Sequence, residues 1–342
     1  MTSFKIKLNK DALERFESYL SSDIYSQDIG LTDHWERRKE ANKNRFVIKG
    51  DNVIIDTSID DGLSDNYKNH FFYNKSKIKY LINKNKTIKR NIVVLLLRML
   101  NQNHGISYNP ISRYVDEWNN VANAIPYTDI FNEYGYIEDY GIYKNAAIYN
   151  YIKRFEINNS FKPNNILEIG AGPGSLTRFT KKLNPTRKFT LIDLSFNLPF
   201  SFLNLAYNFP NSTFRLPNEM IKKFDESVDF NFVSSSQIDL LPDSFYDAGI
   251  NTMSFQEMRT NDIEEYFLLL RRVLKKENIF FCLNAVEKPM IFDNKKLVPI
   301  RFHEYPWIKE DVNYEYTLST IEQGRTYKPF YWKATKLYKS EK

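Results

Sequence analysis

The sequence predicts an α/β fold in its C-terminal part, with a mostly parallel sheet, helices on both faces and an antiparallel edge. From Ile166 onward, short apolar segments of strand length alternate with segments of helical periodicity, which is the pattern of βαβ units. Residues 1–158 contain neither this alternation nor a glycine-rich turn, and most of their patterned segments have helical periodicity. We therefore expect two regions, a mostly helical one at 1–158 and the α/β domain at 159–342.

The first region has five segments with a recognisable pattern. Residues 46–59 alternate apolar and polar side chains around Val53 and Ile55, which predicts a short hairpin. A polar loop at 158–165 separates this region from the next. The other four segments are expected to be helices, at 10–20, 91–102, 112–124 and 141–155.

The second region begins with a strand at 166–169. The helix after it has an apolar face with a spacing of three and four residues, formed by Leu176, Phe179 and Leu183. After a strand at 189–192, an apolar helix is expected to be interrupted by Pro199. Further strands are expected at 230–233, 248–252 and 279–283, followed by an antiparallel pair at 314–320 and 330–337.

The helix that precedes the strand at 279–283 carries its own start signal. Asn261 is expected to cap the first turn, and Glu264 stands three residues later, where its side chain can reach back to the cap. The apolar residues that follow recur at helical spacing, so one face of the helix should be buried. That face is expected to consist of Ile263, Phe267, Leu270 and Leu274.

The most informative stretch is the glycine-rich turn in the run 166–175. Glycines stand at alternate positions, Gly170, Gly172 and Gly174. Only glycine lets a backbone turn this sharply while a ligand approaches within contact distance, because a Cβ would occupy the ligand's space. An acid closes each of the first two strands, Glu168 and Asp193. Two parallel strands joined by such a turn and a helix form a crevice for a nucleoside.

Two classes of nucleoside ligand compete for this turn. A dinucleotide site requires G-x-G-x-x-G, but Ser175 stands where its third glycine would fall and Gly174 stands one position early. The pattern is instead acid-x-G-x-G-x-G, which suits a ligand without a pyrophosphate. It favours S-adenosylmethionine (SAM), with Glu168 at the ligand's ammonium group. Asp193 would then hold the ribose hydroxyls through charge-assisted hydrogen bonds.

Later strand ends supply further candidates for the same crevice, because ligands of open α/β sheets lie outside the carboxyl ends of the strands. The segment after the third strand, with Gln237, Ile238 and Asp239, is expected to cover the adenine, although Gln237 and Asp239 could be ordinary polar loop residues. Asn251 follows in the fourth strand. The residues expected to contact SAM are Glu168, Gly170, Ala171, Gly172, Gly174, Asp193, Leu194, Gln237, Ile238 and Asn251.

Four segments together carry a resemblance to a known family. They are Ile-Leu-Glu-Ile-Gly-Ala-Gly at 166–172, Leu-Ile-Asp-Leu at 191–194, Asn-Thr-Met-Ser-Phe-Gln-Glu-Met at 251–258 and His-Glu-Tyr-Pro-Trp at 303–307. This set, within residues 160–310, resembles the sugar O-methyltransferases of bacterial surface-polysaccharide gene clusters. The chain departs from the expected pattern at Ala171 and Pro173. The resemblance implies a Rossmann-like seven-stranded SAM methyltransferase sheet, SAM as methyl donor and a sugar hydroxyl as acceptor.

In such an enzyme the acceptor would be a sugar, a sugar nucleotide or a glycan, and residues 1–158 would cap the cofactor and shape the acceptor site. A hydroxyl attacks only as it loses its proton, so a base is expected nearby. The candidates are Glu257, His303 and Asp239, in that order. Tyr305 and Trp307 are expected either to form an aromatic platform for a sugar ring or to be buried anchors.

Composition narrows the other possibilities. The net charge of +6 is spread among interspersed acids and bases, so a nucleic-acid partner is not expected. The longest apolar run, 92–97, is too short to span a membrane, and the single cysteine, Cys282, fits a cytoplasmic protein. The acids and histidines show no metal-ligand spacing, so no metal is expected. The alternatives are a methyltransferase with another acceptor, including nucleic acid, a SAM-binding scaffold without activity and a dehydrogenase.

Overall fold

The computed structural model describes residues 3–28, 33–42, 44–56, 140–220, 224–292, 296–323 and 326–339. The chain divides into two compact units. One contains residues 1–67, 162–319 and 330–342, and the other contains 68–161 and 320–329. The helices expected at 91–102 and 112–124 lie outside the described residues.

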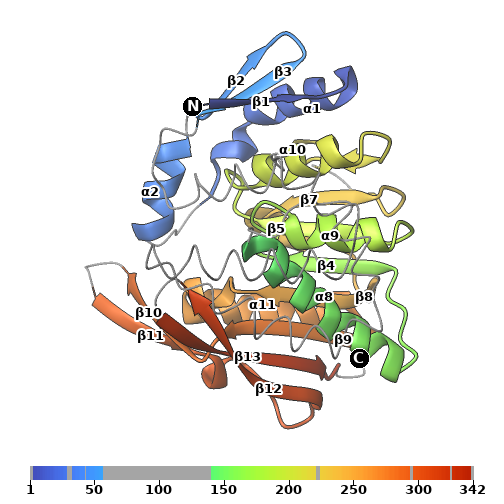
Figure 1. Ribbon diagram of the computed structural model, residues 1–342, viewed down its shortest axis with the longest axis vertical. Helices are drawn as coiled ribbons and strands as arrows, with labels where there is room; N and C mark the ends of the chain where they lie inside the picture. The colour runs from blue at the N-terminus through green and yellow to red at the C-terminus, as the bar shows by residue number, and fades with distance from the viewer. Residues whose placement is uncertain are drawn as a thin grey trace, which may run out of the picture. The chain divides into compact units, whose positions relative to one another are not determined.

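An eight-stranded sheet forms the centre of the fold, with the strand order β12-β13-β9-β8-β4-β5-β7-β6 (Figure 1). Neighbouring strands from β6 to β9 run parallel, and β13 pairs antiparallel with β9. The predicted α/β class and the antiparallel edge are confirmed. The sheet has one strand more than the seven expected, because two residues beside β7 form β6. The strands are β4 (Asn165–Ile169), β5 (Lys188–Asp193), β6 (Phe214–Arg215), β7 (Phe230–Ser234), β8 (Tyr246–Thr252), β9 (Leu274–Ala285), β12 (Val312–Gln323) and β13 (Thr326–Lys336).

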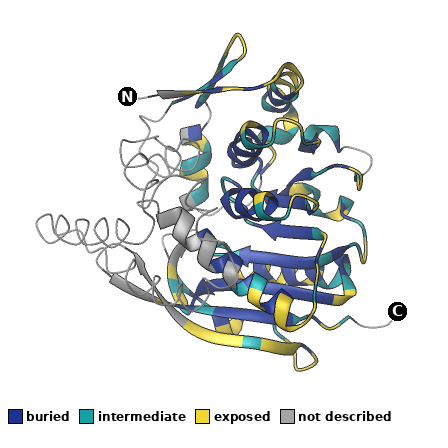
Figure 2. Cartoon of the chain, turned by 45° about the vertical axis from the view of Figure 1, so that its right-hand side comes forward, coloured by how far each residue is buried: buried dark blue, intermediate teal, exposed yellow. Residues whose placement is uncertain are grey.

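The central strands are buried on both faces, which explains why their sequences are nearly continuous apolar runs (Figure 2). Side chains alternate between the faces. Leu167, Ile169 and Ile192 belong to the core cluster that includes the helix α11 (Thr260–Val273). On β5, Leu191 instead lies near Gly174 and Leu205, and so faces the helices α9 (Ser175–Leu183) and α10 (Leu198–Asn208). Helices therefore cover both sides of the sheet.

Two expectations about helix starts are corrected. Pro199 lies in the first turn of α10, where the missing backbone N–H costs nothing, so it begins this helix rather than interrupting it. In α11 the cap is Arg259 rather than Asn261, and the carboxylate of Asp262 accepts its backbone N–H at 3.1 Å. The helix begins two residues earlier than expected, which places Asn261 inside the first turn. Ile263, Phe267 and Leu270 are buried as predicted, and Leu274 is buried at the start of β9.

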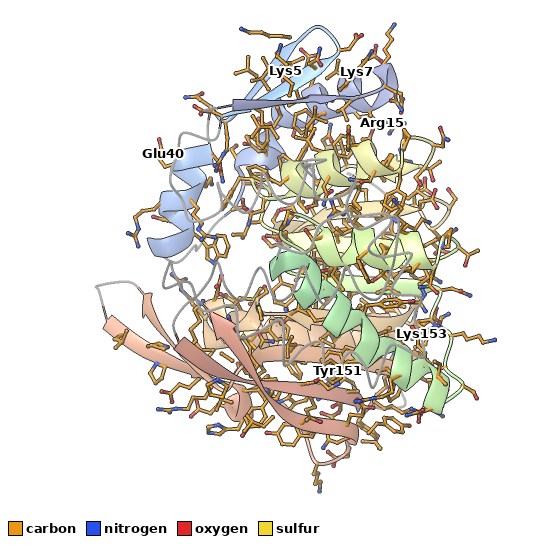
Figure 3. The ribbon with its side chains drawn as sticks, in the orientation of Figure 1. Lys5, Lys7, Arg15, Glu40, Tyr151 and Lys153 are labelled. Carbon is orange, nitrogen blue, oxygen red and sulfur yellow. The ribbon has the colours of Figure 1, made fainter. Side chains whose placement is uncertain are left out.

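The N-terminal segment packs on α10 through aromatic side chains. Helix α1 (Lys10–Leu20) has the predicted bounds, and Asn9 caps it by accepting the N–H of Ala12. The ring of Phe16 in α1 stacks on Phe202 of α10 with centroids 5.8 Å apart. Arg15, labelled in Figure 3, reaches Glu219 at 2.5 Å. The other elements of this segment are β1 (Ser3–Lys7), the 3-10 helix η1 (Asp23–Ser26), α2 (Asp33–Asn42), β2 (Phe46–Lys49) and β3 (Asn52–Asp56).

The predicted hairpin is confirmed as β2 and β3, up to residue 56. Strand β1, which the sequence analysis did not predict, pairs antiparallel with β3 and completes a three-stranded sheet. A second hairpin, which the sequence analysis did not predict, lies between β9 and β12. It is formed by β10 (Glu287–Phe292) and β11 (Lys296–Arg301). Helix α8 (Tyr140–Asn158) belongs to the second unit and confirms the helix expected at 141–155.

Candidate active site

A cavity of about 280 Å³ lies where the strands β4, β5, β7 and β8 end. This is the edge at which open α/β sheets bind ligands, and the volume is near the low end of the roughly 300–1,000 Å³ of small-molecule sites. The lining comes from the strand ends, from α11 and from the N-terminal segment. The lining residues are Gln27, Trp35, Gly170, Asp193, Leu194, Ser235, Ser236, Ile238, Ser254, Glu257, Met258, Asp262, Glu265 and Tyr266.

The glycine turn after β4 requires glycine at all three positions. Gly170, Gly172 and Gly174 have φ angles of 68°, 54° and 68°, a left-handed conformation that strains other residues. A Cβ on Gly170 would lie 1.8 Å from Oγ of Ser254, so the turn and the end of β8 are in close contact. A Cβ on Gly172 would meet no atom within 4 Å. The turn therefore combines one crowded glycine with one whose missing side chain leaves open space.

Asp193, at the end of β5, holds this turn in place. One carboxylate oxygen accepts the N–H of Gly172 at 2.6 Å, and the other accepts the N–H of Leu194 and the side-chain amide of Asn197. Burial raises the pKa of Asp193 to about 6, and the three hydrogen bonds oppose that rise. The predicted ribose-binding acid thus lines the cavity and also fixes the backbone of the neighbouring glycine turn.

Carboxylates dominate the charged part of the lining. Asp193 lies on the β5 side, and Glu257, Asp262 and Glu265 lie on or just before α11. Among the lining residues, all of which belong to the described part of the chain, none is a lysine or an arginine. A cavity lined by one sign of charge concentrates ligands of the opposite sign. The lining therefore favours a cation.

Glu257 is the predicted base that the structure places in the cavity. It ends the short 3-10 helix η4 (Phe255–Glu257) after β8, and its side chain is partly exposed. Lys288 of β10 donates a hydrogen bond to its carboxylate, from outside the lining. Just before η4, Met253 has φ 58°, an uncommon conformation for a non-glycine residue, and Ser254 lines the cavity. The carboxylate is accessible and has one charged partner.

Three residues expected to contact the cofactor make internal contacts outside the cavity lining. Glu168 is buried and accepts a hydrogen bond from the hydroxyl of Thr177 in α9. Gln237 accepts the N–H of Ser234 and donates to the carbonyl of Pro217. Asn251 is fully buried. Its side chain donates to the carbonyl of Ile169 and accepts from Phe255 N–H and the Asn284 amide, so it joins β4, β8, β9 and η4.

Of the other residues expected to contact the cofactor, four line the cavity and three do not. Gly170, Asp193, Leu194 and Ile238 line the cavity. Ala171, Gly172 and Gly174 belong to the same turn as Gly170 but are not part of the lining.

The two other candidate bases lie outside the cavity lining. His303 is in the 3-10 helix η6 (Phe302–Glu304) with 64% of its side chain exposed, 3.9 Å from Glu304. Asp239 is exposed in the 3-10 helix η3 (Ser235–Leu240). The structure thus brings Glu257 and Asp193 to one cavity and leaves His303 and Asp239 at the surface.

Tyr305 lies in the hydrophobic core, and Trp307 is partly buried and packs against that core. Tyr305 is buried, and its ring contacts Phe255 and Phe302 at centroid distances of 5.8 and 5.1 Å. The indole N–H of Trp307 donates to the carbonyl of Phe302, and its ring packs edge-on against Phe267. Of the two roles that the sequence left open, the structure favours burial.

Several lining residues were missed by the sequence analysis. Gln27 directly follows η1 and Trp35 lies in α2, and nothing local in the sequence connects them with the glycine turn. Asp262, Glu265 and Tyr266 did carry a signal. Their spacing of three and four residues places them on one face of α11, next to its buried stripe. A polar stripe beside the apolar one could have identified this wall.

Among the residues that the structure describes, no group of three or more His, Cys, Asp or Glu side chains could hold a metal ion. No helix in the same part of the chain is long and apolar enough to cross a membrane.

Comparisons with known proteins give remote likenesses only. No protein-family model and no curated protein matches the sequence. A SAM-dependent methyltransferase of Leishmania major is 12% identical, with a TM-score of 0.40, over 65% of this chain and 83% of that one. TehB of Haemophilus influenzae is 14% identical, with a TM-score of 0.41, over 61% of this chain and 66% of that one.

A third solved structure is the Burkholderia thailandensis 1,6-didemethyltoxoflavin N1-methyltransferase with its acceptor and S-adenosylhomocysteine bound. It is 10% identical, with a TM-score of 0.39, over 67% of this chain and 90% of that one. Likenesses this remote carry no argument about the ligand or the reaction of this chain. The strand order and the antiparallel β13 beside β9 define the fold. The chain has an α/β Rossmann-like mixed sheet.

Proposed function

We propose that the protein is a SAM-dependent O-methyltransferase that methylates a sugar hydroxyl of a surface polysaccharide or of its precursor. The observation that carries the donor is the contact between the glycine turn and Asp193, at the edge of an acidic cavity. The support for a sugar acceptor is the sequence resemblance of the segments at 251–258 and 303–307. The position of Glu257 in the cavity agrees with hydroxyl chemistry.

The residues present fit SAM in two respects. SAM is a sulfonium that also carries an ammonium group, and the cavity lining is acidic. The carboxylate of Asp193 can take the two ribose hydroxyls, because such charge-assisted hydrogen bonds are short and strong. Gly170 and Leu194 flank it, and Ser235 and Ile238 line the wall expected at the adenine. The role of Glu168 at the ammonium group stays a prediction.

When bound, SAM would supply a methyl group on a positively charged sulfur. The leaving group would be S-adenosylhomocysteine, in which that sulfur is neutral. In the proposed step the acceptor oxygen forms a bond to the methyl carbon as the carbon–sulfur bond breaks. Glu257 takes the hydroxyl proton. A base at this position contributes about 10²–10⁴-fold, and alignment of the two reactants contributes further.

Trp35 and Tyr266 are the aromatic side chains of the cavity lining. Trp35 is half-buried, and the guanidinium of Arg38 lies 4.9 Å from its ring centroid. We assign to Trp35 the role of an apolar platform for the acceptor ring, because Tyr305 is buried in the core and Trp307 packs against that core. In this proposal, Gln27 and Trp35 are the residues through which the N-terminal region shapes the acceptor site.

The acidic lining favours a second candidate acceptor, an amine. Asp262 and Glu265 line the cavity from α11, and an ammonium group of an acceptor would pair with them. Transfer to nitrogen would follow once the ammonium lost its proton to Glu257. The two candidates differ in the atom that is methylated, and mass spectrometry of the product with fragmentation separates them.

Calorimetry tests the donor first. SAM and S-adenosylhomocysteine are expected to bind, and NAD is expected not to bind. A chain that binds NAD and not SAM would contradict the proposal. Methyl-labelled SAM is then offered with neutral sugars, amino sugars, sugar nucleotides and isolated surface glycans. Label in an O-methyl ether of a sugar supports the proposed acceptor, whereas label in RNA alone would replace it by a nucleic acid.

A further inference from the structure

A buried carboxylate of the N-terminal segment lies against the strand ends that form the cavity. Asp28 is 7% exposed. It accepts the backbone N–H of Ser195 at 2.9 Å and a hydrogen bond from the hydroxyl of the same residue. The hydroxyl of Ser235 donates to it at 3.5 Å. One side chain far from the sheet in sequence therefore holds residues that follow two different strands.

Both partners adjoin the proposed donor site. Ser195 directly follows Asp193 and Leu194 in the chain. Asp193 and Leu194 both line the cavity. Ser235 lines the cavity itself, directly after β7. A shift of Ser195 would move Asp193, and a shift of Ser235 would move the wall expected at the adenine. The contacts of Asp28 thus act on both halves of the nucleoside site.

The same contacts hold the N-terminal wall of the cavity. Gln27, which lines the cavity, precedes Asp28. The amine of Lys39 in α2 donates to the carbonyls of Ser26 and Asp28 at 2.8 and 3.1 Å, which ties the helix that carries Trp35 to this segment. Tyr19 of α1 donates to the carbonyl of Ser195 at 2.7 Å. Asp28 takes part in two of these contacts, because its carbonyl accepts from Lys39 and its carboxylate accepts from Ser195.

A carboxylate at this place is costly for the fold. Burial raises the pKa of Asp28, and the negative charges of Asp28 and Asp193 repel each other. Hydrogen bonds from Ser195 and the nearby charge of Lys39 oppose the rise. With an amide at this position, the amide oxygen could accept the backbone N–H of Ser195 without the charge. The amide NH2 could donate to the Ser195 hydroxyl, whose single hydrogen would then go to the carbonyl of Tyr25 at 2.9 Å. What the contacts require is a polar side chain of this length at this position.

We propose that Asp28 is a positioning residue of the donor site: through Ser195 and Ser235 it sets the positions of Asp193 and of the wall after β7. This inference rests on the proposed function, because it takes SAM as the ligand of the cavity. Asp28 does not itself line the cavity, so its effect on the donor is indirect.

Calorimetry with SAM on three single variants of the full chain tests this role. Asp28→Ala is expected to weaken SAM binding about tenfold, the factor expected for loss of one hydrogen bond to a charged group. Asp28→Asn is expected to keep affinity within about twofold of the wild type, because the amide oxygen can accept the backbone N–H of Ser195 and the amide NH2 can donate to its hydroxyl. Asp23→Asn is the matched control, since Asp23 is an exposed acid of the same segment.

Kinetics separate positioning from a loss of folded protein. For Asp28→Ala the KM for SAM should rise about tenfold while kcat changes little, whereas a smaller folded fraction would lower the apparent kcat and leave KM unchanged. If Asp28→Ala does not fold, Ser195→Ala and Ser235→Ala replace it, and each should raise the Kd for SAM severalfold.

Two outcomes are distinct failures. A wild type that does not bind SAM contradicts the proposed function. A wild type that binds SAM, with the same Kd in Asp28→Ala or in both serine variants, overturns the role of Asp28 alone.

Discussion

Asp193 and Gly172 are joined by a hydrogen bond of 2.6 Å from the glycine N–H to the carboxylate, across the ends of two neighbouring parallel strands. An acid that would bind the ligand's ribose therefore also shapes the turn beside it. The carboxylate is buried, and this gives it a measurable signature in pH.

Stability should fall as the pH rises through the range in which Asp193 ionises. Burial raises its pKa to about 6 in the folded protein, against 3.8 as its ordinary value. Between these values the folded state holds a proton that the unfolded state releases, so the contribution is complete below about pH 4 and lost above about pH 6. It corresponds to about 3 kcal/mol. Urea unfolding of the wild type and of Asp193→Asn across pH 4–7 measures it.

The variant should show a flatter pH profile than the wild type. Asp239→Asn, at an exposed acid, controls for the loss of one charge. Equal slopes in Asp193→Asn and the wild type would show that this carboxylate does not titrate in the window.

Gly170→Ala should destabilise the fold by about 3 kcal/mol. The left-handed backbone costs about 1–2 kcal/mol for a non-glycine residue, and the new methyl would lie 1.8 Å from Oγ of Ser254. Gly50→Ala is the matched control, because Gly50 has φ 56° and nothing within 4 Å of a Cβ. Denaturant unfolding compares the two.

The destabilisation of Gly170→Ala beyond that of Gly50→Ala measures the cost of the contact with Ser254. Adding Ser254→Gly should recover that part, since it leaves only the Cα of residue 254 at 3.8 Å. No recovery in the double variant would mean that backbone strain alone sets the cost.

Glu257→Gln should lower kcat by about 10²–10⁴-fold and leave the Kd for SAM unchanged, because the amide cannot take the acceptor's proton. Methyl-transfer assays and calorimetry measure the two quantities. Glu264→Gln, at an exposed acid of α11, is the control and should keep full activity. Full activity in Glu257→Gln would move the base to another residue, with His303 the next to test.

Trp35→Ala should raise the KM for the acceptor severalfold to about tenfold, with a smaller change for SAM. The reason is the loss of an aromatic surface against which the acceptor packs. Trp35→Phe keeps a ring and should fall between the alanine variant and the wild type. Initial-rate kinetics with each substrate varied in turn give both constants. A change confined to the KM for SAM would place Trp35 at the donor instead.

The elements that the sequence predicted well are those whose signal is local. Helix α1 has a cap, Asn9, and an apolar face, so its bounds could be read from eleven consecutive residues. The stripe of α11 and the central strands β4 and β5 are equally local patterns. Strand β1 is not, because its five residues become a strand only by pairing with β3, some fifty positions later.

The candidate site shows the same division. Asp193 and Glu257 could be placed because strand ends of a parallel sheet meet at one edge, so knowing the strands was enough. Trp35 could not be placed, since its position depends on tertiary contacts of the N-terminal segment such as Asp28 with Ser195. The sequence could not decide whether Tyr305 is an aromatic platform or a buried anchor, because it shows that the ring is large but not whether the ring is buried.

Helix α10 is apolar nearly all round, and nine of its residues, from Leu198 to Ala206, are buried. Its outer face is covered by the N-terminal segment, with Phe16 against Phe202 and Phe46 against Phe200 at 4.8 Å. A shortened chain that began just before the glycine-rich turn would expose these phenylalanines to water as an apolar patch prone to aggregation. The N-terminal segment therefore shields an apolar face of α10 from water, and any expression or crystallisation of the candidate active site should retain it.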